Sequence, residues 1–276
     1  MKNNNWICTH LGALGLLFLV ALAGCSAEQE LSQSQVENSF SKRNLTGSFV
    51  ALNSSGKIIA SHGDYKTLGT LPASTFKIYN ALIALDCKTV PDENFLIKWD
   101  GKKRFLKSWN QDHTLKSAFK VSAVWYYKKI AQKIGQQKMQ AALRKLDYGN
   151  QDVSAGLDKF WLEGNMKITP LEQAKLLRKL HDEKLPFKKF AMQKVKQMML
   201  LKTCANYKLF GKTGFTDDAD LNIGWFVGWV ESQNGTTYFA LRLCQPGKRA
   251  ANFVKSRKEI ALELLRIMDA IPKVAI

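Results

Sequence analysis

The sequence predicts an α+β fold, in which one antiparallel sheet is flanked by terminal helices and carries an inserted helical lobe. Strand-like segments lie near both ends of the chain, over residues 47–61 and 207–243. A block with helical periodicity separates them, and an amphipathic segment over 251–268 closes the chain. The simplest arrangement is an α/β sandwich whose single sheet is built from both ends, with a cleft where the sheet meets the helical lobe.

The first half of the chain begins with a predicted hairpin, because residues 47–52 and 57–61 flank the turn Asn53-Ser54-Ser55-Gly56. Apolar residues then recur at helical spacing, and Pro170 stands at the entry of one predicted helix, where proline is favoured. The helices expected in this block are 74–86, 115–135 in two pieces, 138–146, 170–181 and 188–201.

The second half changes to the two-residue period of strands over 207–212, 221–231 and 236–243. Asn234-Gly235 separates the last two segments and is a strong hairpin signal. We therefore expect an antiparallel meander that leads into the closing helix.

Length and composition indicate one sizeable core. The chain has 276 residues, of which 46% are hydrophobic, and this content excludes a disordered protein. Its formal net charge of +18 raises the possibility of an anionic partner. The lysines are spread over the predicted helices and are not gathered in a motif with stacking aromatics, so we expect solvated faces and no nucleic-acid partner.

The first 24 residues resemble a secretion signal. Lys2 precedes an apolar run over 11–23 that is too short to span a bilayer comfortably. The run ends in Leu22-Ala23-Gly24-Cys25, which resembles a bacterial lipobox and predicts lipidation of Cys25. The alternative is an ordinary signal peptide that is cut nearby, with Cys25 incidental. Either reading places the mature chain outside the cytoplasm, and we favour a periplasmic lipoprotein anchored to the membrane.

These features divide the chain into a signal peptide over 1–24, a Ser-, Gln- and Glu-rich tether over 25–39, and a folded domain over 40–276.

If Cys25 carries lipid, the mature chain keeps three other cysteines, which permit one disulfide. Cys204 and Cys244 are the favoured pair, and unpaired core thiols are the alternative. No C-x-x-C occurs, so we expect no metal site.

The pattern S-x-x-K carries little information alone, because the chain contains it four times, at Ser39/Lys42, Ser54/Lys57, Ser74/Lys77 and Ser117/Lys120. Only Ser74/Lys77 follows a proline at a helix start and is flanked by almost wholly apolar residues. Burial would disfavour the ammonium form of Lys77, and a neutral amine beside a serine hydroxyl is the activation logic of serine–lysine acyl transfer. The alternative is a lysine that snorkels to the surface and a serine that only caps the helix.

Two further motifs could complete such a site. Lys212-Thr213-Gly214 ends a predicted strand and suits an anionic substrate laid along the strand edge. A phosphate loop would need glycine at Asn206, so that reading fails, and an ordinary basic strand end remains the alternative. Ser122 lies in a helical stretch, where it could relay a proton to a leaving amine or serve only as a small packing residue.

Five ordered motifs together resemble the class D (oxacillinase-type) serine β-lactamases over roughly residues 40–268. They are S-T-F-K at 74–77, S-A-V at 122–124, Y-G-N at 148–150, F-W-L-E-G at 160–164 and K-T-G-F at 212–215. The resemblance implies a β-lactamase/transpeptidase-like catalytic domain over 40–276. It also implies hydrolysis of the β-lactam amide of penicillin-type antibiotics through a serine acyl-enzyme, which confers antibiotic resistance.

The resemblance assigns the reacting groups residue by residue. Ser74 corresponds to the acylated nucleophile, and Lys77 to the lysine that becomes N6-carboxylysine with carbon dioxide or bicarbonate and acts as general base. Trp161 corresponds to the tryptophan that hydrogen-bonds this group, and Val124 would separate it from bulk water. Ser122 would pass the proton to the β-lactam nitrogen.

The same resemblance assigns the binding groups and implies no metal and no other cofactor. The backbone N–H groups of Ser74 and Phe215 would form the oxyanion hole. The substrate carboxylate would be held by Lys212, Thr213 and an arginine. Arg257 is the first choice for that arginine and Arg249 the second. Gly214 would let the strand approach the substrate, and Trp109 would line the cleft. We expect a monomer or a homodimer with a β-lactam as its small-molecule partner.

Trp125 and Tyr126 depart from the family, which more usually has proline and then a small apolar residue after S-A-V. The bulky indole of Trp125 could alter the cleft wall or pack outward.

Three other functions compete with hydrolysis: an antibiotic sensor that stays acylated, a D-Ala-D-Ala peptidase and a structural lipoprotein. Sensors carry several spanning helices before the domain, and Trp161 in F-W-L-E-G favours the lactamase over the peptidase.

Overall fold

The computed structural model describes residues 33–218 and 220–272. The predicted signal peptide and Cys25 lie outside the described residues. Within the described part, no helix has the length and apolar character that crossing a membrane requires.

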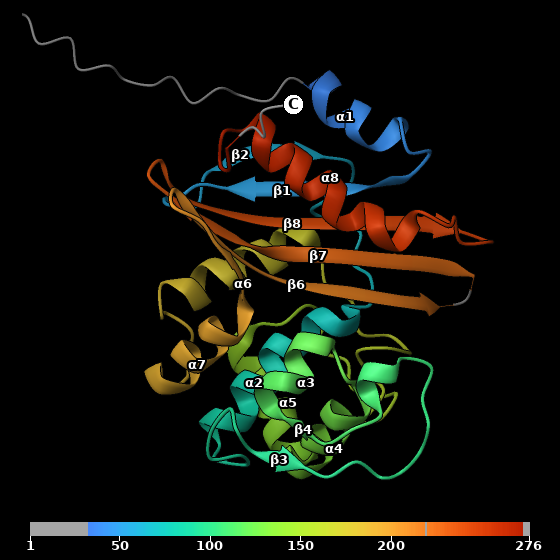
Figure 1. Cartoon of the computed structure of the whole chain (residues 1–276), viewed down its shortest axis with the longest axis vertical. Helices are drawn as coiled ribbons and strands as arrows, with labels where there is room; N and C mark the ends of the chain where they lie inside the picture. The colour runs from blue at the N-terminus through green and yellow to red at the C-terminus, as the bar shows by residue number, and fades with distance from the viewer. Residues whose placement is uncertain (1–32, 219, 273–276) are drawn as a thin grey trace, which may run out of the picture.

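A six-stranded antiparallel sheet forms the centre of the domain, with the strand order β2-β1-β8-β7-β6-β5 (Figure 1). Strand β1 pairs with β8 from Thr46↔Cys244 to Leu52↔Tyr238, so the first hairpin joins the last strand of the meander. This pairing confirms the expected single sheet built from both ends of the chain. The strands are β1 (Thr46–Leu52), β2 (Ile58–His62), β5 (Leu200–Thr203), β6 (Tyr207–Asp218), β7 (Leu221–Ser232) and β8 (Gly235–Pro246).

Helices cover both faces of this sheet. Helices α1 (Gln33–Ser41) and α8 (Phe253–Ile267) lie on one face, and α6 (Pro170–His181) lies on the other (Figure 1). Alternate residues of strand β7 pack into the hydrophobic cores on the two faces of the sheet. Trp225 and Val227 belong to the core on the α6 side, whereas Phe226 and Val230 belong to the core under α8. The alternation follows from the two-residue period of side chains along a strand.

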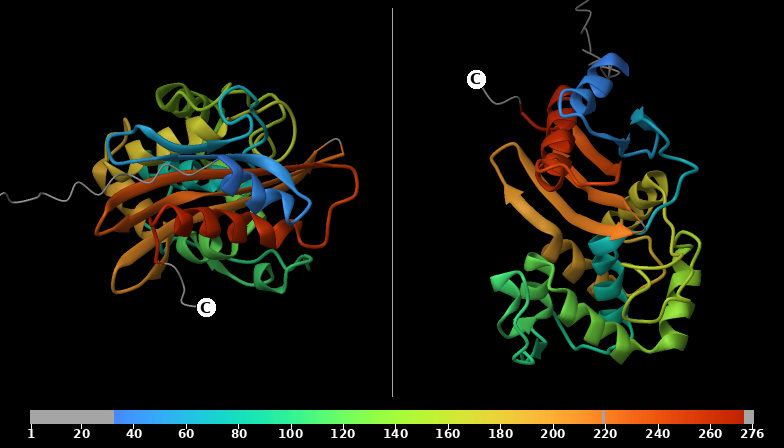
Figure 2. Two further views of the ribbon diagram at one scale, coloured as in Figure 1. Left: turned by 90° about the horizontal axis from the view of Figure 1, so that it is seen from above. Right: turned by 90° about the vertical axis from the view of Figure 1, so that its right-hand side faces the viewer.

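The helical lobe lies below the sheet on the α6 side, as the right-hand view of Figure 2 shows. Helix α2 is its buried centre, because every residue from Lys77 to Leu85 is buried. The lobe consists of the 3-10 turn η1 (Ala73–Phe76), α2 (Lys77–Asp86), α3 (Leu115–Val121), α4 (Val124–Ile134), α5 (Gln136–Leu146) and α7 (Lys189–Met199), with η2 (Lys107–Trp109) and the short strands β3 (Leu96–Ile97) and β4 (His113–Thr114).

Two elements differ from the sequence prediction. The helix expected over 188–201 ends at Met199, and Leu200–Thr203 form the edge strand β5. Part of the expected tether over 25–39 lies in α1, where Val36 and Phe40 are buried and Ser39 Oγ donates to Glu263 on α8 over 2.9 Å. The packed structure therefore begins by Gln33, because these few apolar residues find a partner helix that sequence patterning does not show.

The favoured disulfide is wrong. Cys87, Cys204 and Cys244 are free thiols. Cys244 lies in β8 and Cys204 just follows β5, so β6 and β7 separate them. Neighbouring strands lie about 4.8 Å apart, which places the two residues well beyond the Cα separation of about 7 Å that a disulfide can bridge.

Candidate active site

The chain enters the site through a strained turn. Ala73 has φ of +50°, a left-handed conformation that is uncommon for a residue with a Cβ, and it opens the 3-10 turn that carries Ser74. Strand β6 passes close to this turn, since a Cβ at Gly214 would lie 3.0 Å from the carbonyl oxygen of Pro72. Trp225 Nε1 also donates to the Leu71 carbonyl over 2.9 Å and holds the segment ahead of the turn.

Ser74 and Lys77 form a buried pair. Lys77 Nζ lies 2.7 Å from Ser74 Oγ, and the lysine side chain is fully buried. Burial lowers the pKa of Lys77 from its usual value to about 7, so a large fraction of the amine is neutral near neutral pH. The expectation of a buried lysine beside the serine is confirmed, and the alternative of a snorkelling lysine is wrong.

A second serine–lysine pair, Ser122 and Lys212, lies near the first, since the charge of Lys77 acts on Lys212. Lys212 Nζ on β6 donates to Ser122 Oγ over 2.9 Å and to the Thr213 carbonyl over 3.0 Å. Burial lowers the pKa of Lys212, and the neighbouring charges of Lys77 and Arg257 lower it further. The motif Lys212-Thr213-Gly214 lies in the middle of β6 instead of at a strand end.

Ser122 does not lie inside a helix. It ends α3 with φ of +60° and ψ of +36°, and α4 begins two residues later. A residue with a Cβ in this left-handed conformation stores strain that the surrounding contacts must hold. The turn directs the hydroxyl group of Ser122 toward Lys212.

Trp161 carries an unpaired buried donor. Its side chain is fully buried, its ring stacks on Phe76 with centroids 5.7 Å apart, and its indole N–H has no hydrogen-bond partner among the described residues. Thr216 Oγ1 donates to the Leu162 carbonyl over 2.9 Å and ties this loop to β6. An orphaned buried N–H is costly, so the pocket suits an added acceptor. Val124, partly exposed, is the first residue of α4.

Arg257 reaches the site from α8. Its guanidinium donates to the Gly214 carbonyl, while its buried Nε has no partner among the described residues. Burial lowers the pKa of Arg257 to about 10, so it stays charged at neutral pH. Arg249 is exposed and lies 4.8 Å over the ring of Phe215. The first-choice arginine therefore adjoins the Lys212–Gly214 segment, and a site with these cations favours an anionic substrate.

Comparisons with known proteins agree with this geometry. The family model described as the penicillin-binding protein transpeptidase domain matches residues 47–266. The crystal structure of the class D β-lactamase FUS-1 (OXA-85) from Fusobacterium nucleatum subsp. polymorphum superposes with a TM-score of 0.82 at 38% identity, over 87% of this chain and 100% of that one. The chain belongs to the class D β-lactamases.

Sequence relatives support the same membership. The probable β-lactamase YbxI of Bacillus subtilis (strain 168) is 47% identical over 66% of this chain and 67% of its own length. β-Lactamase OXA-48 of Klebsiella pneumoniae is 41% identical over 73% of this chain and 75% of its own length. The chain thus has the expected fold and is an enzyme of this class.

In this class D β-lactamase, Trp125 does not pack outward. The side chain is 6% exposed, and its Nε1 donates to the Trp109 carbonyl over 2.8 Å. Trp109 is partly exposed, and its own Nε1 donates to the Val121 carbonyl over 2.9 Å. Tyr126 is buried and donates to the Phe95 carbonyl over 2.6 Å.

No role follows from the sequence for two buried supports of the class D site, Gln173 and Thr75. Gln173 Nε2 donates to Thr75 Oγ1 over 2.8 Å, and Thr75 Oγ1 in turn donates to the Pro72 carbonyl over 2.6 Å. Both residues are fully buried. Nothing in the local sequence of α6 marks Gln173, and only the signal of a polar residue on its buried face could have suggested it.

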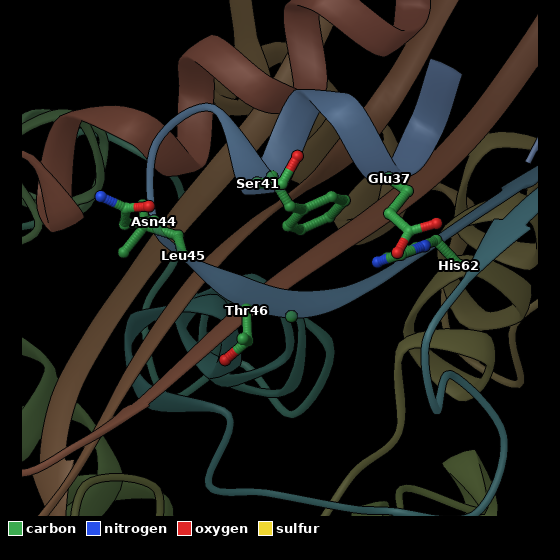
Figure 3. Close-up of a pocket in the computed structure, with 8 residues that line it drawn as sticks. Glu37, Ser41, Asn44, Leu45, Thr46 and His62 are labelled. Carbon is green, nitrogen blue, oxygen red and sulfur yellow. The ribbon is translucent and has the colours of Figure 1, made fainter. Parts of the chain in front are cut away.

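A separate hollow lies between α1 and strands β1 and β2, with Glu37 and His62 on its rim (Figure 3). The ring of Phe40 stacks on His62 at 4.6 Å, and partial burial lowers the pKa of His62 against the opposing effect of Glu37. The hollow lacks a nucleophile–base pair. Among the described residues, no group of three or more His, Cys, Asp or Glu could hold a metal ion.

Proposed function

We propose that the protein hydrolyses the β-lactam amide bond of penicillin-type antibiotics through an acyl-enzyme on Ser74, with a carboxylated Lys77 as general base. The single observation that carries this proposal is the fully buried Lys77 amine, 2.7 Å from Ser74 Oγ and with its pKa lowered to about 7. A neutral amine is the form that can attack carbon dioxide, and burial supplies it.

The pocket fits a carboxylated lysine. The unpaired N–H of Trp161 can donate to an anionic oxygen, and the described residues show no carboxylate paired with Lys77. When bound, the carboxyl group supplies an oxygen base in place of the amine. Ser74 Oγ loses its proton to that base as it attacks the β-lactam carbonyl, and a water molecule is deprotonated in the same way when it releases the acyl group.

Two other groups would serve the acylation step. The C–N bond of the ring breaks as the acyl–Ser74 bond forms, and the leaving nitrogen takes a proton from Ser122 Oγ. Lys212, which lies 2.9 Å from Ser122 Oγ, would replenish that proton. The proton taken from Ser74 would then pass from the general base to the neighbouring Lys212, which frees the base to deprotonate the deacylating water. The backbone N–H groups of Ser74 and Phe215 would hold the oxyanion, because β6 passes directly beside η1.

Substrate binding would use the cationic wall of the cleft. Lys212, Thr213 and Arg257 lie together, and Arg257 Nε is an unpaired buried donor that a substrate carboxylate can satisfy. Gly214 keeps the strand close to the nucleophile turn, and Trp109 would form part of the opposite wall.

The experiment is turnover of nitrocefin and benzylpenicillin by the wild type and by Ser74→Ala, with mass spectrometry of the trapped protein. We expect multiple turnover, a transient acyl adduct on Ser74, and no adduct in the variant. Wild-type protein that stays acylated after one equivalent would contradict hydrolysis and would identify a sensor. Failure of any adduct to form would remove the nucleophile assignment.

We also propose that the mature chain is a periplasmic lipoprotein, lipidated at Cys25 and joined by a tether to the catalytic domain. The support is the lipobox-like sequence and the apolar run before it. Labelled palmitate should enter the wild type and not Cys25→Ser, and label in both proteins would contradict the proposal. Light scattering of the solubilised chain would separate a monomer from a homodimer.

A further inference from the structure

We infer that Trp125 is a positioning residue for acylation: with Trp109 it forms a brace that holds the strained turn of Ser122 and the adjoining cleft wall. This inference rests on the role proposed above for Ser122. The Trp125–Trp109 brace is defined by two hydrogen bonds, from Trp125 Nε1 to the Trp109 carbonyl at 2.8 Å and from Trp109 Nε1 to the Val121 carbonyl at 2.9 Å.

The brace grips the Ser122 turn from both sides. Val121 immediately precedes Ser122, and Trp125 follows it by three residues, so residue 109 bridges the two flanks of the turn. Ser122 holds a left-handed conformation that is unfavourable for a side chain with a Cβ. Contacts that over-determine such a turn keep its hydroxyl group in place, and here that group lies 2.9 Å from Lys212 Nζ.

Trp125 is itself held firmly. Its ring lies within cation–π distance of two side chains, Arg104 at 5.3 Å and Lys129 at 5.2 Å from the ring centroid. Arg104 is fixed by two hydrogen bonds to the carboxylate of Asp100, each of 2.8 Å. The buried His113 ring packs against the same indole at 5.9 Å. The indole is therefore anchored independently of the Ser122 turn, as a brace must be.

The loop that carries Trp109 is also tied to α3 by a hydrogen bond between His113 Nδ1 and Ser117 Oγ, which lie 3.0 Å apart. Asn110 exchanges two hydrogen bonds with the backbone of Arg104, and His113 Nε2 bonds to the Ser108 carbonyl over 2.9 Å. The bonds of Asn110 and of His113 Nε2 order the loop internally. The indole of Trp125 joins it to α4, and the indole of Trp109 joins it to the end of α3.

The brace acts on one chemical step. Ser122 would protonate the leaving nitrogen as the ring C–N bond breaks, which happens during acylation and not during hydrolysis of the acyl-enzyme. Displacement of the hydroxyl group by a few tenths of an ångström should slow acylation and leave deacylation unchanged. A residue with only a structural role would lower both rates together, through the folded fraction.

The test compares Trp125→Phe with Trp99→Phe in the full chain, using rapid-mixing acylation and deacylation rates with benzylpenicillin. Phenylalanine keeps an aromatic ring at this position and removes the N–H donor together with part of the indole, and the same loss of ring volume occurs in the Trp99 variant. Trp99 lies in the segment between β3 and η2, which leads to Trp109. Its Nε1 donates locally to the Lys102 carbonyl over 3.1 Å, so Trp99→Phe is a matched control. We expect acylation to fall about five- to tenfold in Trp125→Phe, as loss of one neutral hydrogen bond implies, and both rates to stay within about twofold in Trp99→Phe.

A double variant sharpens the result. In a Ser122→Ala background, adding Trp125→Phe should cost less than about twofold more in acylation, because the group that the brace positions is already gone. Additive losses, an equal fall in deacylation, or identical behaviour of Trp125→Phe and Trp99→Phe would overturn the inference. A wild type that never acylates would instead overturn the proposed function, so the two failures are distinguishable.

Discussion

The same four-residue pattern, S-x-x-K, occurs at Ser74/Lys77 and at Ser54/Lys57, but the first pair is buried and the second is exposed to solvent. Ser54 and Lys57 are exposed at a hairpin turn, where Ser54 Oγ bonds to the Thr236 carbonyl over 3.3 Å. Lys77 is fully buried beside Ser74 Oγ, and its pKa falls to about 7. Spacing alone therefore does not activate a serine, since removal of water from the amine is what changes its chemistry.

Replacing each lysine in turn is the most direct test of whether activity depends on the buried pair and not on the exposed pair. Lys77→Ala should lower kcat/KM for nitrocefin by at least about a thousandfold, because it removes the general base. Lys57→Ala, the matched lysine of the exposed pair, should stay within about twofold of wild type. Steady-state kinetics of both variants measure the difference, and a Lys77→Ala enzyme within tenfold of wild type would refute the assignment.

The buried pair also depends on the donor of Trp161. Trp161→Phe should lower activity about ten- to a hundredfold at low bicarbonate, since a buried charged acceptor loses its hydrogen bond, and added bicarbonate should restore much of it. Trp229→Phe is a suitable control, because that buried indole bonds to Glu231. If Trp161→Phe matches wild type in bicarbonate-depleted buffer, the carboxylated lysine is wrong.

A second contrast lies between two arginines. Arg257→Gln should raise KM for benzylpenicillin about tenfold or more, because a charged hydrogen bond to the substrate carboxylate is lost. Arg249→Gln should change KM less than about threefold, since Arg249 is exposed and stacks on Phe215. Equal effects in initial-rate measurements would mean that the two arginines share the carboxylate.

The amine of Lys77 should also appear in the pH dependence of stability. Its folded pKa of about 7 lies below the unfolded value of 10.5, so the unfolded chain binds the extra proton between these pH values. Stability therefore rises with pH across that window, by up to about 1.4 kcal/mol per pH unit from this group. Relative to Lys77→Met, bicarbonate-free wild type should gain about 2 kcal/mol in unfolding free energy from pH 7 to 9. Denaturant titrations of both proteins at pH 7 and pH 9 measure this difference. An equal change in unfolding free energy in the two proteins would exclude a contribution from Lys77.

The sequence carried most of the site because its motifs keep their order and chemistry. Ser74, Lys77 and Lys212 could be singled out from the ordered motif series, because the apolar flanks alone leave Ser74/Lys77 undecided and the pattern predicts a strand end for Lys212. The positive φ of Ser122 could not, because it depends on how α3 meets α4. The residues of β5 continue the apolar pattern of α7, so only their pairing with β6 reveals a strand.

Helix α1 and Trp125 show that sequence patterning does not reveal contacts between distant parts of the chain. The α1 sequence is largely polar, and it folds against α8 through few apolar side chains, so its composition reads as a tether. Trp125 stands out as an unusual residue, but its partners lie in a loop that sequence patterning does not place. Long-range contacts decided both outcomes.

The pairing of Thr46 with Cys244 has a consequence for biogenesis. The N-terminal hairpin lacks its neighbouring strand until β8, nearly 200 residues later in the chain, has been synthesised. Closing so long a loop is slow, and the β6 wall of the cleft also comes from this late segment. A chain halted before β8 would hold the serine of η1 without the completed sheet beside it, so catalysis has to wait until synthesis of the chain is nearly finished.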